Sequence, residues 1–176
     1  MGYPIIVCYA GGTCGDIISQ ILDPAELTLE RQRLKKPHLF ANKQEKDLFL
    51  GTTQYHSIPS HDFEYHCNSG HGVLGIVCRN MPDAIWAASR FKSLHRPHVW
   101  DEMTKFCGSN SVESYAQIII DFGNMLANYA TDVVYLDDII HGKAVSRLGE
   151  LGYKTPGADK YKKWLIDNET GNNSHS

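Results

Sequence analysis

A glycine-rich turn joins the first apolar segment of the chain to a segment with helical spacing. The turn, AGGTCGD at residues 10–16, follows the apolar run YPIIVCY and precedes isoleucine and leucine residues spaced as on one face of a helix. Glycine lets a backbone approach a ligand closely, and the first turn of a helix carries unpaired N–H groups in a partly positive field. The turn therefore predicts a binding site for a negatively charged group such as a phosphate. The residues predicted to form it are Gly11, Gly12, Thr13, Cys14, Gly15 and Asp16, with the Thr13 hydroxyl as a further donor.

The same residues also fit a tight strand-to-helix turn that binds nothing. In that case Asp16 is a first-turn carboxylate that interacts with the helix dipole. If the turn binds a phosphate, Asp16 has to face away or act through a metal, because two like charges ~4 Å apart repel by about 4 kcal/mol near a protein surface. The turn is not a Walker A motif, since the lysine of that motif is absent.

An arginine follows the second clear apolar segment. Arg79 comes directly after GVLGIVC, a run typical of a strand buried on both faces, and the segment RNMPD then leads into a helical pattern. Ligand contacts in parallel sheets lie beyond the carboxyl ends of the strands, where a guanidinium can bind a phosphate through two hydrogen bonds. Arg79 is therefore predicted to bind the same ligand as the glycine-rich turn.

Together these segments resemble the sulfotransferase family over about residues 5–153. The family has a P-loop-type α/β fold and transfers a sulfuryl group from 3′-phosphoadenosine 5′-phosphosulfate (PAPS), leaving the desulfated product PAP. The resemblance implies that the turn binds the 5′-phosphosulfate and that Arg79 binds the 3′-phosphate. A serine eight positions after the arginine shares that task in the family; here Ala87 occupies its place and Ser89 is the nearest serine, so both positions enter the predicted cofactor site.

The resemblance also implies a catalytic base. The family uses a histidine in a KTHLP-like segment, and the corresponding segment here is QYHSIP, which places His56 23 positions before Arg79. His56 would remove the proton of a hydroxyl or amine acceptor, with His61 as the nearest substitute. The expected partner is a small-molecule or glycan acceptor, and no metal is required. The family's loop lysine and its C-terminal RxGxxG segment are absent.

Other functions remain open on the sequence alone. A small-molecule kinase or another phosphotransferase would need Mg²⁺, for which Thr13, Asp16 and Asp137 are the available ligands. A catalytically degenerate P-loop domain would bind a nucleotide without turnover. The turn is also similar to the GGTxGD/H opening of two-domain glycosyltransferases, which need a second domain for the sugar nucleotide.

Basic and aromatic residues gather after Arg79. The segment SRFKSLHRPH at 89–98 carries Arg90, Lys92, His95 and Arg96, which either supply the missing cations or form a solvated basic face. Trp86 is predicted to pack in the core. The alternative is that Trp86, Trp100 and Phe106 stack on an adenine ring or shape an acceptor pocket.

Alternating strand and helix patterns predict the elements that position these residues. Strands are expected at 3–9, 52–58, 72–78 and 131–136, and helices at 16–22, 83–91, 112–129, 143–151 and 159–166, with surface helix and loop at 28–50. This alternation predicts an α/β fold, a three-layer parallel sheet flanked by helices of the P-loop NTPase/sulfotransferase type.

Composition is that of a soluble globular domain. The chain has 176 residues, 42% of them hydrophobic, and a formal net charge of −3, which argues against a general nucleic-acid binder. No apolar run reaches the ~20 residues that span a bilayer. One α/β domain is expected over residues 1–167, followed by a disordered polar tail at 168–176. The five cysteines form no CxxC pair or familiar zinc spacing, which favours reduced thiols and a cytoplasmic protein.

Overall fold

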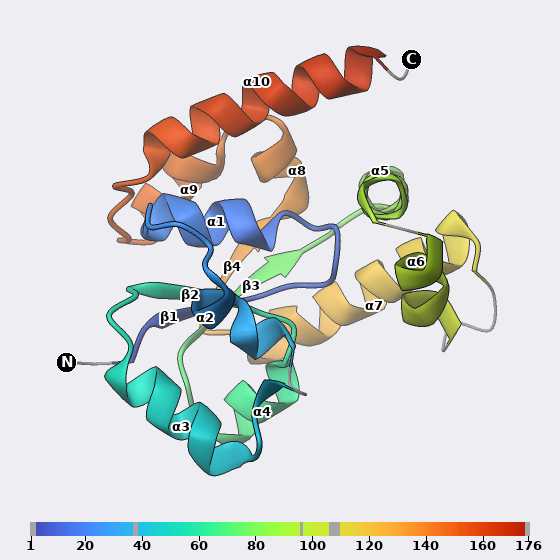
Figure 1. The fold of residues 1–176 in the computed structure, drawn as a ribbon. Helices are drawn as coiled ribbons and strands as arrows, with labels where there is room; N and C mark the ends of the chain where they lie inside the picture. The colour runs from blue at the N-terminus through green and yellow to red at the C-terminus, as the bar shows by residue number, and fades with distance from the viewer. Residues whose placement is uncertain (1–2, 37–38, 96, 106–109, 175–176) are drawn as a thin grey trace.

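A parallel sheet of four strands organises the chain. The computed structural model describes residues 3–36, 39–95, 97–105 and 110–174. In the order β2-β1-β3-β4, the strands are β2 Ser57–Ser60, β1 Ile5–Cys8, β3 Val73–Val77 and β4 Asp132–Tyr135, and each pair of neighbours is parallel. Helices cover the sheet (Figure 1). The predicted α/β fold with an all-parallel sheet flanked by helices is confirmed.

The helices begin where the sequence offers capping side chains. The oxygen of Asn42 accepts from the Glu45 N–H, that of Asn80 from the Asp83 N–H and that of Ser111 from the Ser114 N–H. The helices are α1 Gly15–Leu22, α2 Leu29–Gln32, the 3₁₀ turn η1 Arg33–Lys35, α3 Lys43–Thr52, α4 Phe63–Asn68, α5 Met81–Leu94, α6 Pro97–Thr104, α7 Val112–Tyr129, α8 Leu136–Ile140, α9 Ala144–Glu150 and α10 Ala158–Ser174.

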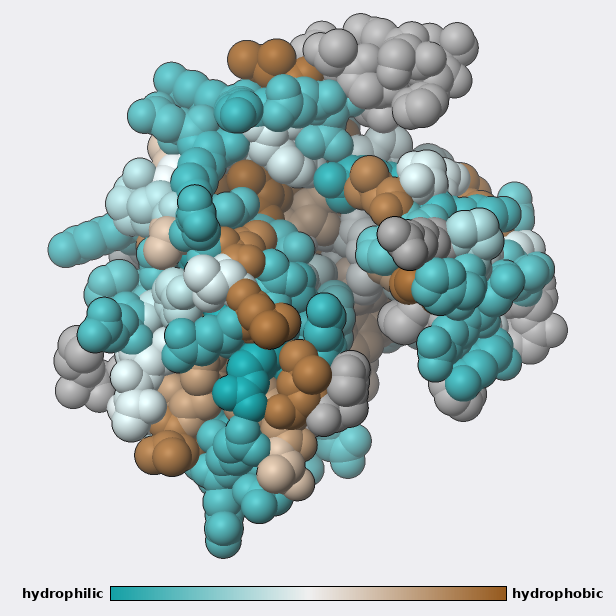
Figure 2. Space-filling view, in the orientation of Figure 1, coloured by the Kyte–Doolittle hydropathy of each residue, from teal (hydrophilic) through white to brown (hydrophobic). Residues whose placement is uncertain are grey.

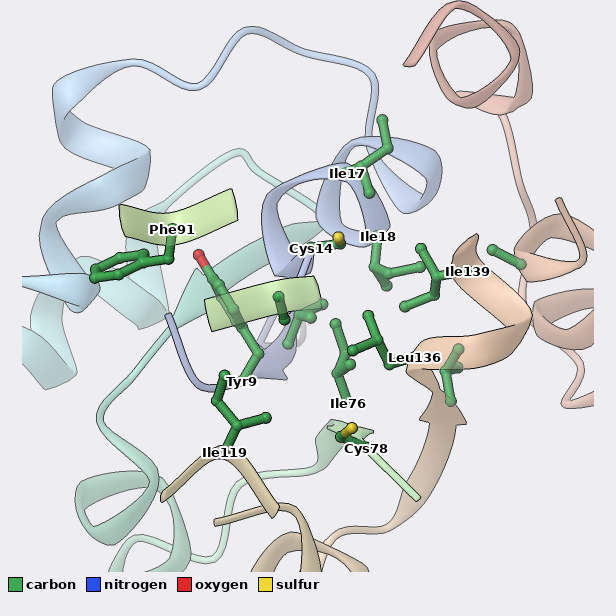
Figure 3. Close-up of a cluster of buried hydrophobic side chains, with 14 of the residues drawn as sticks. Tyr9, Cys14, Ile17, Ile18, Ile76, Cys78, Phe91, Ile119, Leu136 and Ile139 are labelled. Carbon is green, nitrogen blue, oxygen red and sulfur yellow. The ribbon is translucent and has the colours of Figure 1, made fainter. Parts of the chain in front are cut away.

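Alternate strand residues face two hydrophobic clusters, one on each side of the sheet. Val7 and Leu74 belong to the cluster that includes residues of α1, α5, α8 and α9 (Figure 3), whereas Ile6 and Val73 belong to the cluster with α3 and α4. Successive side chains of a strand point to opposite faces, and strands buried on both faces are nearly all apolar. The apolar runs of β1 and β3 therefore follow from their place inside the sheet.

The second strand lies later in the chain than the sequence predicts. The pattern favours a strand at 52–58, but α3 continues to Thr52 and β2 spans Ser57–Ser60 with Pro59 inside it. Proline removes a backbone donor and is tolerated on an edge strand. Since β2 is the edge of the sheet and pairs with β1 alone, Pro59 is compatible with this position.

The last helix continues through most of the polar tail. Helix α10 spans Ala158–Ser174, so it includes residues of the 168–176 stretch for which the sequence predicts disorder, and the final two residues lie outside the described part. The single domain at 1–167 stays a prediction. Among the described residues, none of the helices combines the length and the apolar character that crossing a bilayer requires.

Candidate functional site: the glycine-loop pocket

A pocket opens beside the glycine-rich turn, at the carboxyl edge of the sheet. We call it the glycine-loop pocket; its empty volume is about 630 Å³, part of which is open to solvent. In Figure 2 the surface is hollowed between α10 and the α5–α6 region. The pocket is lined by Tyr9, Gly11, Gly12, Cys14, Gly15, Asp16, Ile17, Lys35, His61, Arg90, Phe91, Leu94, His95 and Trp164.

Packing against the chain itself already requires the glycines of the turn. A Cβ on Gly12 would lie 2.6 Å from the Ala87 carbonyl oxygen, and Gly12 has a φ of +95°. A Cβ on Gly15 would lie 2.1 Å from the Tyr9 ring. Cys14 adopts the left-handed region with φ 68°, which non-glycine residues occupy at a cost. The turn is thus held tightly in a conformation that exposes its backbone to the pocket.

Four backbone donors of the turn have no hydrogen-bond partner in the part of the chain that the structure describes. Among the described residues, no hydrogen bond uses the N–H groups of Gly11, Gly12, Gly15 or Asp16. The Thr13 hydroxyl, by contrast, donates to the Ala10 carbonyl at 2.7 Å and is buried, so it is not available as the further donor that the sequence suggests. What the turn offers to an anion is its backbone and the positive end of α1.

Asp16 is held by two partners inside the pocket. The Lys35 ammonium lies 2.8 Å from Asp16 Oδ1 and 3.1 Å from Oδ2, and the Tyr9 hydroxyl donates to Oδ1 at 2.6 Å. Burial, followed by the Asp16 charge, raises the pKa of Tyr9 well above its usual range, so Tyr9 remains a donor. The ion pair removes the bare negative charge that would oppose a phosphate at the turn.

Arg90 lines the same pocket, and no carboxylate among the described residues neutralises its charge. Its Nε donates to Asn168 Oδ1 at 3.0 Å, and within the described part of the chain no carboxylate pairs with it. Arg90 lies one helical turn from Ala87, whose carbonyl contacts Gly12, and this spacing brings the guanidinium to the turn. The sequence analysis treats Arg90 only as one of several cations in the segment 89–98. Of the others, His95 also lines the pocket, whereas Arg96 lies outside the described residues.

His61 is oriented to act as a base. Its Nδ1 lies 2.7 Å from the Tyr9 carbonyl oxygen, and because a carbonyl can only accept, Nδ1 carries the proton and Nε2 has the free lone pair. Burial lowers the pKa of His61, so the ring is neutral near pH 7. His61 also lines a second pocket of about 820 Å³, whose apolar walls include Phe63, Phe122 and Met125.

His56 lies at the other end of the same strand. It precedes β2, is exposed, and its carbonyl accepts from the Ile5 N–H at the amino end of β1. The four residues of β2 lie between His56 and His61, so the two are five residue steps apart, about 16 Å at ~3.3 Å per residue. The structure therefore does not bring His56 to the glycine turn, whereas His61, the nearest substitute considered for it, lines the glycine-loop pocket.

Arg79 also points away from the turn. Its guanidinium forms an ion pair with Asp137 and lies 3.8 Å from the centre of the Tyr135 ring, and it lines a different pocket with Asp138 and Arg147. Asn80 caps α5 and so has a structural function in the RNMPD segment. The other two predicted cofactor positions lie on α5: Ala87 packs against Gly12, and Ser89 is exposed outside the lining of the glycine-loop pocket.

The ligands considered for Mg²⁺ do not meet in one place. Thr13 is buried and its hydroxyl donates to the Ala10 carbonyl, Asp16 pairs with Lys35, and Asp137 pairs with Arg79, which lines a different pocket. Across the described ranges no three metal-ligating side chains cluster. Cys14 is also an unsuitable nucleophile, because burial raises the pKa of its thiol to about 12. The kinase alternative therefore lacks a supporting observation.

The Gly15→Ala substitution should destabilise the fold by about 1–3 kcal/mol, the range of overpacked cores. The new methyl group meets Cγ, Cδ1 and Cε1 of the buried Tyr9 ring at 2.1–2.3 Å, and a shift of the ring would disturb the hydrogen bond from its hydroxyl to Asp16. Gly149→Ala in α9 is the matched control, since nothing lies within 4 Å of its Cβ and alanine is the better helix former. Urea unfolding should show a loss for the first variant and none for the second; equal midpoints would contradict this packing.

Two residues of the pocket carry little signal in the sequence. Lys35 comes from η1, in a charged stretch without periodicity, and His61 follows a strand whose position the pattern misplaces. The feature of the sequence that could have identified His61 is its position directly after an edge strand that contains proline. No family model, curated protein or solved structure matches this chain, so the function of the pocket has to be argued from its own geometry.

Proposed function

We propose that this chain is a sulfotransferase-like enzyme with a P-loop-type fold that transfers a sulfuryl group from PAPS to a hydroxyl or amine acceptor. The observation that carries the proposal is the position of His61, which lines both the glycine-loop pocket and the apolar pocket beside it. A base at the junction of two pockets can remove a proton from a group in one pocket as that group attacks a ligand in the other.

The free cysteines Cys8, Cys14, Cys67 and Cys78 are consistent with the cytoplasmic location that belongs to this proposal.

The glycine-loop pocket would bind the phosphosulfate end of the donor. Free N–H groups of the turn and the guanidinium of Arg90 supply hydrogen bonds and positive charge, as required for an anion. Lys35 is a further cation within the pocket and comes from η1, in place of the loop lysine of the family. Transfer reactions of this type depend on positioning and on the stabilisation of charge, with little covalent work for the protein.

In the proposed reaction the acceptor oxygen or nitrogen attacks the sulfur of PAPS. The new bond from acceptor to sulfur forms as the bond from sulfur to the bridging oxygen breaks, and PAP leaves with the electron pair of that bond. The acceptor proton passes to Nε2 of His61, which is free because Nδ1–H donates to Tyr9. Arg90 and the turn stabilise the charge that develops on PAP.

The apolar pocket would bind the acceptor. Phe63, Phe122, Met125 and Tyr129 form most of its walls, and Glu64 and Asp62 lie at its polar side. Such a lining suits a small molecule with an apolar body and one hydroxyl or amine group near His61. The geometry thus favours a small-molecule acceptor over an extended glycan.

His61→Gln should lower sulfuryl transfer by a factor of about 10²–10⁴, the usual contribution of a positioned base, and leave PAP binding within about twofold of wild type. His56→Gln is the control and should retain full turnover, since His56 lies at the amino end of β2. Transfer from ³⁵S-labelled PAPS to a panel of phenols and amines measures the rate, and calorimetry with PAP measures binding. Loss of turnover in the His56 variant with normal rates in the His61 variant would refute the assignment.

A nucleotide-binding protein without turnover is the second candidate. The observation in its favour is the Asp16–Lys35 ion pair, because the Lys35 ammonium that the transfer step would use is already bound to the Asp16 carboxylate. PAP binding without sulfuryl transfer to any member of the panel would favour this candidate over the first.

A further inference from the structure

A third pocket adjoins the glycine-loop pocket and shares Trp164 with it. We call it the α5–α10 pocket; its empty volume is about 750 Å³. Trp86 of α5 forms one side, Trp164 and Asn168 of α10 form the other, and His141 and Gly142 come from the segment after α8. The two pockets therefore have one indole ring in common.

The indole rings of Trp86 and Trp164 both lie near Arg90, the arginine of the glycine-loop pocket. The Arg90 guanidinium lies 5.8 Å from the centre of the Trp86 ring and 5.6 Å from that of Trp164. The amide of Asn168 fixes this arrangement, because its Oδ1 accepts from Arg90 Nε at 3.0 Å and its Nδ2 donates to the Trp164 carbonyl at 2.8 Å. A ligand bound to Arg90 through an anionic group therefore has indole faces within reach.

Exposure separates these two tryptophans from the third in the chain. Trp100 is 2% exposed, and its Nε1 donates to the Asn110 carbonyl, as expected of a core residue. Trp86 and Trp164 are only partly buried and line a pocket. Trp86 thus packs against the core with one part of its ring and leaves another part available to a ligand.

We infer that the α5–α10 pocket binds the planar ring of a nucleoside phosphate whose phosphate lies in the glycine-loop pocket. This inference rests on the proposed function, and it adds the place where the base of the donor is recognised. A purine ring is flat and apolar on its faces, and stacking on an aromatic side chain raises affinity by a factor of about 10 or more per base. The hydrogen-bonding groups of His141 and Asn168 lie at the same pocket and can contact the ring edge.

A pair of ligands that differ only in the base tests this inference. Adenosine 5′-monophosphate and ribose 5-phosphate are titrated into wild-type protein, with calorimetry and tryptophan fluorescence as readouts. Because two of the three tryptophans border the pocket, the adenine ring should quench much of the emission, and ribose 5-phosphate should not. We expect adenosine 5′-monophosphate to bind at least about 10-fold more tightly.

Variants assign the preference to the pocket. Trp164→Leu should reduce the difference between the two ligands to less than about threefold, while Trp164→Phe retains a ring and most of the preference. Trp100→Phe is the control and should keep both the preference and the quenching. Equal binding of the two ligands by wild type would contradict binding of the base in the α5–α10 pocket but not binding of the phosphate in the glycine-loop pocket. Failure of both ligands to bind would overturn both.

Discussion

Replacing Arg31 with methionine is expected to reduce the free energy of unfolding by about 3–5 kcal/mol, the effect of breaking a buried charged network. The Arg31 side chain is 0% exposed, although it carries a full charge in the interior. Its Nε donates to the Ser57 carbonyl at 3.0 Å, and one terminal nitrogen donates to the carbonyls of Ser19 and Asp23 at 3.0 and 2.8 Å. Methionine fills a similar volume but removes the Arg31 donors from the Ser57 and Asp23 carbonyls, while the Ser19 carbonyl keeps only the Asp23 N–H.

The position of Arg31 explains why the effect is large. The side chain joins the carboxyl end of α1 to the first residue of β2, next to the hydrogen bond between Ser19 and Ser57 and the one from the His56 N–H to the Asp23 carboxylate. Buried carbonyls without a partner cost about 1–3 kcal/mol each. Losing the residue therefore weakens the attachment of the edge strand that positions His61.

Arg33→Met provides the matched control for this prediction. Arg33 belongs to the same segment, but it is partly exposed and forms an ion pair with Glu45 at the surface. Such pairs contribute about 0–1 kcal/mol. Urea unfolding of both variants should show a loss several times larger for Arg31→Met; similar losses in the two variants would contradict a structural function for the buried guanidinium.

Acid should destabilise the fold steeply, by up to about 4–5 kcal/mol between pH 6.5 and pH 3, because His66 cannot take up a proton in the folded state. His66 is 0% exposed; burial, followed by the neighbouring His71, lowers its pKa to about 3. Its Nδ1 lies 3.1 Å from His71 Nδ1 and its Nε2 lies 3.1 Å from Ser60 Oγ, so protonation of both histidines would place two cationic rings in contact.

The sign of the effect follows from the direction of the pKa. The unfolded chain binds a proton at His66 near pH 6.5 whereas the folded chain does not until about pH 3, so stability is complete above pH 6.5 and falls below it. Burial also lowers the pKa of His71, which adds in the same direction. The charged groups that face this pair act on it in opposite directions, Asp62 and Asp47 favouring the protonated rings and Lys46 and Lys43 opposing them.

Urea unfolding between pH 7.5 and pH 4.5 measures this dependence. His66→Gln should reduce the slope by about 1.4 kcal/mol per pH unit below pH 6, since one titrating group is removed. His98→Gln, at an exposed position of α6, should retain the slope of wild type. An unchanged slope in the His66 variant would mean that other groups control acid stability.

Much of the fold follows from sequence pattern, because burial on both faces leaves a clear mark. The apolar runs that become β1 and β3 and the helical spacing of α1, α5 and α7 are all visible in the residue order. Shorter elements leave little trace. Helix α4 has six residues and α8 has five, too few for a period of 3.6 to show, and their limits depend on capping and packing.

The candidate site shows what local pattern cannot supply. The sequence identifies the glycine-rich turn, but the choice between His56 and His61 depends on a strand boundary that a proline obscures. The choice between Arg79 and Arg90 depends on the side chain's direction: Arg79 turns toward Asp137, one strand further along the sheet, while Arg90 follows a helix face that packs on the turn. Both choices are made by tertiary contacts, which no local spacing encodes.

The affinity for PAP of two arginine variants tests the central claim most directly. The account holds that the glycine-loop pocket binds the anionic end of the ligand through Arg90, so Arg90→Gln should weaken PAP binding about 10-fold or more, as expected for a charge-assisted hydrogen bond. Arg79→Gln should leave it within about twofold of wild type, since Arg79 pairs with Asp137 and lines another pocket. Calorimetry on both variants, with urea unfolding to verify their folds, gives the answer. Weakened binding in the Arg79 variant together with unchanged binding in the Arg90 variant would contradict the account.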